Sequence, residues 1–259
     1  MSFLDRFSLK NKVVILTGGA GLYGRGLTAR LASAGATLII ASRTVDTLKE
    51  IAEAETSRGH TVIAENLDLS SGQSIQELVQ RVNETFGRID GLVNNAYLRV
   101  MKGGPDAPVE PWEASLRANA TGLLNIIRAC GEIMYRRESG SIVNIGSIMG
   151  MVGPSPWLYE GTSMSASPDY FYNKGGMVQL TRYFAAYYGA KNVRVNCLSP
   201  GGYFNNQDPK FLERYEKMTM LGRMADDDDL AGAVIFLLSD ASAYITGTNI
   251  PVDGGYTAK

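Results

Sequence analysis

Tyr170 and Lys174 lie four residues apart in the stretch SPDYFYNKGG, so on a helix their side chains share one face. A tyrosine alone is a poor base near neutral pH, because the reference pKa of its hydroxyl is about 10. A nearby lysine ammonium favours the phenolate and so eases proton exchange with an alcohol or carbonyl oxygen. The same spacing also fits an ordinary amphipathic helix. Tyr172 lies two residues off this face and is expected to pack elsewhere.

Short apolar runs alternate with amphipathic stretches along the whole chain. Continuous apolar strands separated by helices indicate a parallel sheet that is covered on both faces. We therefore expect an α/β fold with one doubly wound, seven-stranded parallel sheet, in a single Rossmann-type domain over residues 1–259. The expected strands are 13–17, 37–41, 61–68, 91–96, 141–147, 192–199 and 249–253. The expected helices include 45–58, 74–86, 111–136, 168–188 and 227–239.

A glycine-rich turn follows the first expected strand, in the sequence TGGAGLYGRGL at residues 17–27. Between a strand and a helix, such a turn lets the backbone approach a pyrophosphate, which then sits on the helix N-terminus. The alternative is a plain tight turn, but four glycines within eight residues exceed what a tight turn needs. The sequence therefore predicts a dinucleotide-binding loop.

The end of the second expected strand bears on the choice of cofactor. It reads Ala41-Ser42-Arg43-Thr44, and no acid appears before Asp46. An acid at this place would hold the ribose hydroxyl of NAD, whereas the planar guanidinium of Arg43 suits a phosphate and Ser42 can donate a hydrogen bond. We therefore expect NADP(H). The alternative is that Arg43 only stacks on the adenine and serves NAD and NADP alike.

Composition argues against several classes of function. With 25 basic and 26 acidic residues the net charge is −1, which disfavours nucleic acid as a partner. No apolar run approaches the roughly 18 residues of a membrane span, and the first residues lack the apolar core of a secretory signal. The chain holds only Cys130, Cys197 and His60 as cysteine and histidine. We therefore expect no metal site and a reducing, cytoplasmic setting.

Taken together, the motifs resemble the classical short-chain dehydrogenase/reductase family over essentially the whole chain. Any one of them is weak, but all of them in this order are specific. They are TGGAGLYG for the family's T-G-x-x-x-G-x-G loop, Asp68-Leu69 for its adenine-binding pair, Asn94-Asn95-Ala96 for its N-N-A-G, Asn119 to Gly122 for its N-x-x-G, Ser147 at a strand end, Tyr170-x-x-x-Lys174 for its Y-x-x-x-K, Ser199-Pro200-Gly201, and the C-terminal Ile245 to Gly247 and Val252 to Gly255.

The resemblance implies roles for individual residues. Tyr170 would be the general acid/base, with Lys174 tuning it and binding the nicotinamide ribose. Ser147 would hold the substrate oxygen, and Asn119 would position a water for proton relay. A homotetramer or a homodimer is also implied. The implied cofactor contacts are Gly18, Gly21, Leu22, Tyr23, Ser42, Arg43, Asp68, Leu69, Asn95, Ala96, Tyr97, Tyr170, Lys174, Pro200, Gly201 and Tyr203.

Two single residues and one segment depart from the family's pattern. Leu22 stands at the second glycine of the loop, where a Cβ is expected to cause strain or to displace the cofactor. Tyr97 replaces the glycine of N-N-A-G and brings a bulky ring near the nicotinamide. The segment 148–168 is longer than usual and reads as an insertion near the substrate pocket. Its alternative role is a contact loop between subunits.

The segment 148–168 is also expected to shape substrate choice. The tract YEGTSM lies within this segment, and NNQDPKFLERY follows later in the chain. Both tracts resemble a bacterial subgroup linked to flagellin-glycan and nonulosonate sugar pathways. Arg99 and Lys102 could meet a phosphate or carboxylate, although solvation at the surface is the favoured interpretation. The residues expected to contact a sugar-like ligand are Trp157, Tyr159, Glu160 and Ser163, with Tyr203, Asn205 and Asn206 closing as a lid.

The resulting expectation is an NADP(H)-dependent oxidoreductase that acts on a hydroxyl or carbonyl carbon of a sugar or polyol-like small molecule. The alternative is a sensor or scaffold protein that binds NAD(P) with little or no turnover, which Leu22 and Tyr97 favour. The presence of Asn119, Ser147, Tyr170 and Lys174 together argues for the enzyme. A sugar-nucleotide epimerase or dehydratase is a third, less favoured alternative.

Overall fold

The structure is a computed structural model that describes residues 3–258. Within these residues seven strands form one parallel sheet, as the sequence predicts, and their order is β3-β2-β1-β4-β5-β6-β7. The expected strand ends are right to within two residues. The strands are β1 (Val13–Thr17), β2 (Thr37–Ser42), β3 (Thr61–Asn66), β4 (Gly91–Asn94), β5 (Gly140–Ile145), β6 (Val193–Pro200) and β7 (Asn249–Val252).

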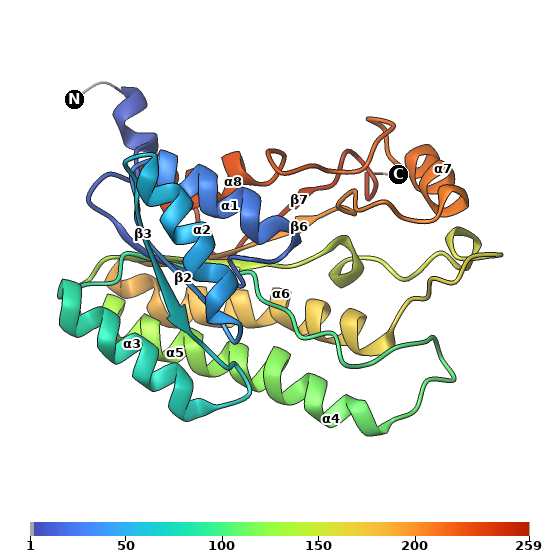
Figure 1. Ribbon diagram of the computed structural model, residues 1–259, viewed down its shortest axis with the longest axis horizontal. Coiled ribbons are helices and arrows are strands. Elements are labelled where there is room, and N and C mark those ends of the chain that lie inside the picture. The colour runs from blue at the N-terminus through green and yellow to red at the C-terminus, as the bar shows by residue number, and fades with distance from the viewer. Residues whose placement is uncertain (1–2, 259) are drawn as a thin grey trace.

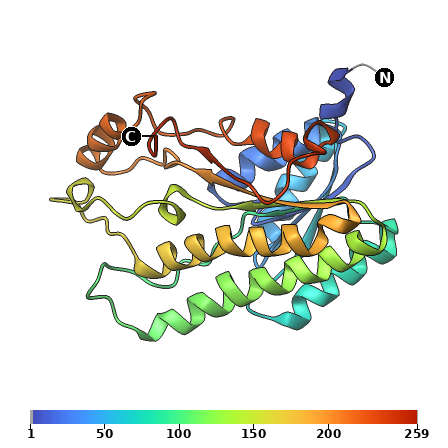
Figure 2. The same cartoon turned by 180° about the vertical axis from the view of Figure 1, so that it is seen from behind.

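Helices cover both faces of the sheet (Figures 1 and 2), and an apolar cluster lies between the sheet and each helical layer. On one face lie α1 (Leu22–Ser33), α2 (Val45–Ser57) and α8 (Ala231–Leu238). On the other lie α3 (Gly72–Phe86), α5 (Gly122–Arg136) and α6 (Pro168–Tyr188), with α4 (Glu110–Leu116) running into α5. The inner strands are apolar on both sides because both sides are covered; every residue of β1 is buried. Short 3₁₀ turns occupy Phe3–Phe7, Ile148–Gly150, Pro156–Leu158, Gly189–Lys191 and Asp240–Ser242.

The helix expected over residues 111–136 is continuous but changes pitch in the middle. Residues Arg117–Thr121 form a π-helical turn between α4 and α5. Such turns accommodate one extra residue and occur frequently at functional sites. Asn119 lies inside this turn, where its side chain is bonded to protein atoms of the neighbouring loop. The sequence analysis did not predict this turn, because one extra residue changes the spacing of apolar residues too little to be recognised.

Helix α7 (Pro209–Met218) was not expected from the sequence. It begins at Pro209 behind an Asp208 side chain that accepts a hydrogen bond from the backbone N–H of Lys210. In Figures 1 and 2, α7 stands apart from the two helical layers, beyond the end of β6. It carries a small apolar cluster that includes Phe211 and Tyr215. This cluster forms part of the wall around the carboxyl ends of the strands.

No helix within residues 3–258 is long and apolar enough to cross a membrane.

Helix α5 approaches the loop after β3 closely because its first residue is a glycine. A Cβ built on Gly122 would lie 2.2 Å from the backbone oxygen of Leu69, which neither backbone can accommodate without moving. We expect Gly122→Ala to lower the free energy of unfolding by about 1–3 kcal/mol. Gly232→Ala in α8 is the matched control, since nothing lies within 4 Å of its Cβ. It should stabilise by up to about 1 kcal/mol. Urea unfolding of both variants measures the difference, and equal effects would contradict the close approach.

Candidate active site

A cleft of about 850 Å³ opens at the carboxyl ends of the central strands. It lies where the strand order changes direction between β1 and β4, the usual ligand site of a doubly wound sheet. Every residue for which the sequence predicted a cofactor contact lines this one cleft, and so do Ser147, Tyr170 and Lys174. Asn119 is the exception: its side chain is buried beside the cleft rather than in its wall.

Two glycines give the turn after β1 its shape. Gly18 has a left-handed backbone with a φ of +71°, and its Cβ would lie 2.9 Å from the backbone of Ala96. A Cβ on Gly24 would lie 2.0 Å from the carbonyl oxygen of Gly18. Leu22, by contrast, simply begins α1 and is half-exposed. The expectation that a Cβ at Leu22 causes backbone strain is therefore wrong, because the residue does not need a positive φ.

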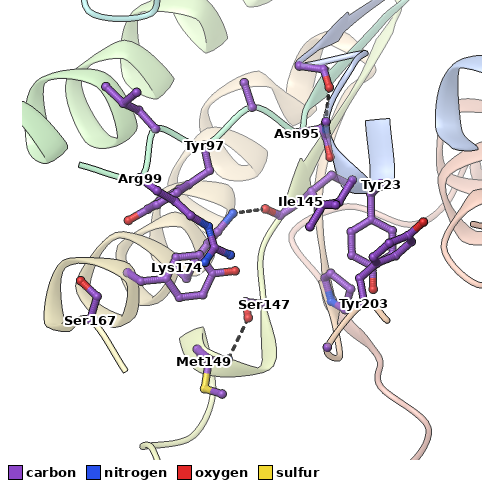
Figure 3. Close-up of a pocket in the computed structure, with 18 of the residues that line it drawn as sticks. Tyr23, Asn95, Tyr97, Arg99, Ile145, Ser147, Met149, Ser167, Lys174 and Tyr203 are labelled. Atoms are coloured by element: carbon purple, nitrogen blue, oxygen red, sulfur yellow. Dashed lines mark hydrogen bonds between the residues drawn. The ribbon is translucent and has the colours of Figure 1, made fainter. Parts of the chain in front are cut away.

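Asn95 holds this turn in place from the neighbouring strand. Its side-chain Nδ2 donates to the carbonyl oxygens of Thr17 and Gly18 at 3.1 and 3.0 Å. In return, the Thr17 hydroxyl accepts from the backbone N–H groups of Asn95 and Ala96, both at 3.0 Å. These bonds tie the ends of β1 and β4 together, as Figure 3 shows in part. Helix α1 begins beside the cleft and has no side-chain cap on its first N–H groups, an arrangement that suits an anion.

The end of the cleft under β2 and β3 carries an exposed cation beside a carboxylate. Arg43 is exposed, and no carboxylate of residues 3–258 pairs with it at ion-pair distance. Asp68 accepts bonds from the N–H and hydroxyl of Ser70 at 2.9 and 2.7 Å. Those bonds, with a smaller contribution from the Arg43 charge, lower the pKa of Asp68. Asp68 therefore stays ionised and can accept hydrogen bonds from a ligand.

Lys174 lies at the centre of the cleft wall and is almost wholly buried. Its Nζ donates to the carbonyl oxygen of Ile145, the last residue of β5, at 2.6 Å (Figure 3). The ammonium lies 5.7 Å from the centroid of the Tyr170 ring and 5.2 Å from that of Tyr97. Burial lowers the pKa of Lys174 to about 8. At pH 7 the side chain is still a cation, and it lies where it can favour a phenolate on the ring above it.

Tyr170 stands in the first turn of α6, as the sequence predicts from Pro168 at the helix start. Tyr172 points away from the cleft, is 59% exposed and packs on Trp112. Ser147 follows the end of β5, and its hydroxyl accepts a bond from the backbone N–H of Met149 at 3.1 Å. The hydroxyl hydrogen of Ser147 is thus left to donate to a ligand oxygen in the cleft.

The sequence analysis missed a group of buried, hydrogen-bonded side chains next to Tyr170, centred on Asp169, which we call the second polar layer. Asp169 is only 1% exposed, and its Oδ2 accepts from the hydroxyls of Ser115 at 2.5 Å and Tyr97 at 3.2 Å. Its Oδ1 accepts from the hydroxyl of Ser167. Ser115 also accepts from the side-chain amide of Asn119 at 3.1 Å. One carboxylate thus links the helix that carries Tyr170 to the π-turn that carries Asn119.

Tyr97 contacts both the Asp169 carboxylate and the Tyr170 ring, which explains how the fold tolerates a ring where the family has glycine. Its hydroxyl is held by Asp169 and by the side-chain amide of Asn173, and burial raises its pKa. Its ring packs edge-on against Tyr170, with the centroids 4.9 Å apart. The signal in the sequence was the pair Asp169 and Asn173, which share a helical face next to that of Tyr170 and Lys174.

The segment 148–168 reaches the cleft with only part of its length. The Tyr159 ring lines the cleft and packs on Phe211 of α7. The expected ligand contacts from three other residues are not found in the cleft wall: Trp157, Glu160 and Ser163. Arg214 of α7 donates to the backbone oxygens of Trp157 and Glu160 at 2.8 and 2.6 Å and lies over the Trp157 ring. These residues therefore hold the segment against α7.

Tyr23 and Tyr203 lie together on the other side of the cleft (Figure 3). Their ring centroids are 4.9 Å apart, and the Tyr23 hydroxyl donates to the carbonyl oxygen of Gly201 at 3.1 Å. The Tyr203 hydroxyl donates to Asp227 at 2.8 Å. Asn205 lines the cleft, but Asn206 and Lys102 do not. The loop after β6 is thus fastened to α1 and to the turn before α8.

Comparisons with known proteins agree with this geometry. A family model described as enoyl-(acyl carrier protein) reductase matches residues 21–257. The chain is 30% identical over 253 residues to post-translational flagellin modification protein A of Campylobacter coli, across 96% of this chain and 99% of that protein. It is 33% identical over 264 residues to an NADP-dependent mannitol dehydrogenase of Hypocrea jecorina, across 99% and 96%. The crystal structure of a gluconate 5-dehydrogenase from Burkholderia cenocepacia J2315, in complex with NADP and tartrate, matches over the full length of both chains with a TM-score of 0.91 and 28% identity.

The buried carboxylate of Asp169 should matter for stability. Asp169→Asn replaces one acceptor oxygen by a donor that faces hydroxyl donors, so we expect the free energy of unfolding to fall by about 1–3 kcal/mol. Asp46→Asn is the control, since the Asp46 side chain is 93% exposed; it should change stability by less than about 0.5 kcal/mol. Urea unfolding followed by circular dichroism compares the two. Equal stability of both variants would show that the second polar layer contributes nothing.

Proposed function

Because this chain belongs to the classical short-chain dehydrogenase/reductase family, we propose that it transfers a hydride between NADP(H) and a hydroxyl or carbonyl carbon of a sugar or polyol. The observation that carries the proposal is one cleft whose wall combines a glycine-rich turn, a tyrosine over a buried lysine and a strand-ending serine. Relatives named as a mannitol dehydrogenase and a gluconate 5-dehydrogenase support a sugar-like substrate. The relative named for flagellin modification agrees with the likeness expected from YEGTSM.

The residues of the cleft fit NADP(H). The glycine-rich turn lines the cleft, and the first N–H groups of α1, which have no side-chain cap, would donate to a diphosphate. Ser42 and the unpaired Arg43 would hold a 2′-phosphate, and Asp68 with Leu69 would contact the adenine. Support for NADP comes also from relatives named as NADP-dependent or solved with NADP. When bound, the nicotinamide supplies or accepts the hydride.

The chain's own residues then handle the proton and the substrate. We assign Tyr170 to exchange a proton with the substrate oxygen, and Lys174 to favour its phenolate through a positive charge that lies 5.7 Å from the ring. Ser147 donates its free hydrogen to the same oxygen. Asn119 has both N–H groups of its amide bonded, to Leu98 and to Ser115. A relay water at Asn119 would therefore be held by an oxygen of this residue.

The departures that suggested a protein without turnover leave the cleft intact. Leu22 starts α1 with its side chain half-exposed. The hydroxyl of Tyr97 is directed to Asp169, and its ring supports Tyr170 from the side. The sensor or scaffold alternative thus gains nothing from these two positions.

Removing the Tyr170 hydroxyl tests the assigned proton transfer. Tyr170→Phe should lower kcat by about 10²–10⁴-fold, because general acid/base catalysis contributes rate enhancements of that size. Binding of NADPH, followed by fluorescence, should remain. Turnover is measured by absorbance of the reduced nicotinamide, with mannitol, other polyols and sugars as candidate substrates. Tyr172→Phe is the matched control and should retain wild-type activity, since Tyr172 faces away from the cleft.

Two outcomes would count against the proposed function. Retained turnover in Tyr170→Phe would remove the proton-transfer role from that residue. Tight NADPH binding by the wild-type protein without turnover of any sugar, sugar derivative or polyol would favour the sensor alternative.

The choice of NADP over NAD rests on Arg43. Arg43→Ala should weaken NADPH binding by roughly 10- to 100-fold, the loss expected for hydrogen bonds to a charged group, and should leave NADH binding nearly unchanged. Lys49→Ala is the control, because Lys49 is exposed in α2 and lies outside the cleft. Titration of nicotinamide fluorescence gives all the dissociation constants. Equal losses for NADPH and NADH would mean that Arg43 only stacks on the adenine.

A further inference from the structure

One exposed positive charge stands next to the reacting end of the cleft. The charged residues of the cleft wall are Arg43, Asp68, Arg99, Asp169 and Lys174. Arg43 and Asp68 come within two residues after the ends of β2 and β3, three or more places in the sheet from β5, and Ser147 comes two residues after the end of β5. Asp169 and Lys174 are buried to 1% and 3% exposure, with their polar atoms bonded to protein. Arg99 is thus the exposed charge at the end where Tyr170 lies.

Arg99 is held in place by a ring rather than by an anion. Its Cζ lies 5.4 Å from the centroid of the Tyr170 ring, and in Figure 3 the side chain extends beside Tyr97 and Lys174. Within residues 3–258, no carboxylate lies at ion-pair distance from it. Other arginines of this chain do have such partners: Arg88 pairs with Asp90 at 2.6 Å and Arg223 with Asp229 at 2.5 Å.

The charge of Arg99 acts across the cleft. Burial is the main cause of the lowered pKa of Lys174, and Arg99 lowers that pKa further. Burial raises the pKa of Tyr159, which also lines the cleft, and Arg99 opposes that rise. The same guanidinium therefore influences groups of both α6 and the segment 148–168. A ligand that contacts both groups must lie in its field.

We propose that Arg99 binds an anionic group of the substrate, so that the preferred substrates are sugar acids or sugar phosphates rather than neutral polyols. This inference rests on the proposed function, whose substrate class it narrows. A guanidinium offers a planar fork of N–H donors that matches a carboxylate or a phosphate. An anion at this place would also offset the repulsion between Arg99 and the buried Lys174 ammonium, which lie over the same ring. The exposed wall here offers no carboxylate that would repel it.

The neutral part of the wall suits the rest of such a molecule. The hydroxyl of Ser147, the Tyr159 ring and the chain at Ser165 line the same end of the cleft. Hydroxyl and backbone groups of this kind bind sugar hydroxyls without adding charge. Arg99 is therefore the group that distinguishes an acid from an alcohol of the same length.

The test compares matched substrates that differ only in charge. D-gluconate is compared with D-gluconamide and with D-glucitol, and a sugar 6-phosphate with the free sugar, using NADP⁺ or NADPH as the reaction requires. The variants are Arg99→Gln, Arg99→Lys and, as control, Lys102→Gln, since Lys102 is exposed and outside the cleft wall. Both kcat/KM and calorimetric binding to the enzyme–NADP⁺ complex are measured. The carboxylate and phosphate pairs separate the two sources of negative charge.

The expected result is a preference of the wild-type protein for at least one charged member of these pairs. Arg99→Gln should reduce kcat/KM and affinity for that anion by about 10- to 100-fold, the loss expected for charge-assisted hydrogen bonds, and should lower both values for the neutral partner by a much smaller factor. Arg99→Lys should fall between the two, because it keeps the charge without the fork. Lys102→Gln should match the wild type. Equal losses for charged and neutral partners, or no preference in the wild type, would overturn the inference.

The two measurements separate this inference from the proposed function. Turnover of neutral polyols with no Arg99-dependent preference for anions would support the oxidoreductase and overturn the anion site. Arg99-dependent binding of an anion to the enzyme–NADP⁺ complex, without turnover of any compound, would support the anion site and count against the proposed function. No binding and no turnover of charged or neutral compounds would count against both.

Discussion

The buried ammonium of Lys174 is the constraint on which the rest of the site depends. A charge taken out of water is costly unless hydrogen bonds and opposite or polarisable groups surround it. Here the Ile145 carbonyl and the faces of two tyrosine rings meet that need. Because Ile145 ends β5 and Lys174 belongs to α6, one bond fixes the register of the helix against the sheet. Gly150 permits the contact, since its Cβ would lie 2.6 Å from the Lys174 backbone oxygen.

The register of α6 against the sheet also positions Tyr170, one helical turn before Lys174, and the neighbouring Asp169. Tyr170 is placed above the ammonium, and its neighbour Asp169 is turned into the protein, where its carboxylate accepts from the hydroxyls of two other segments and of the helix's own N-cap. Through Ser115 the same carboxylate reaches Asn119 and the π-turn between α4 and α5. The wide turn, the helix start and the ring of Tyr97 are thus parts of one polar arrangement. Its cooperative bonds favour a single geometry for the tyrosine that faces the cleft.

Sequence reasoning reached the fold and most of the cleft wall because those features are encoded locally. Apolar runs gave the seven strands, Pro168 gave the start of α6, and the spacing of Tyr170 and Lys174 placed both on one face. It missed helix α7, and it expected Trp157 to contact a ligand, whereas Arg214 of α7 holds this residue outside the cleft wall. Contacts between two surface segments do not require a periodic pattern of apolar residues in either segment, so the sequence analysis could not predict them.

By itself, then, the sequence determined the α/β architecture, the glycine-rich turn and the order of motifs that place the chain in its family. Only the tertiary structure decided what Leu22, Tyr97 and Arg99 do. Leu22 causes no backbone strain because its φ is not positive, Tyr97 is accommodated because Asp169 receives its hydroxyl, and Arg99 stays unpaired because no carboxylate of residues 3–258 reaches it. The physical reason is common to all three. Backbone conformation, burial and charge pairing depend on residues far away in the chain, which local spacing does not report.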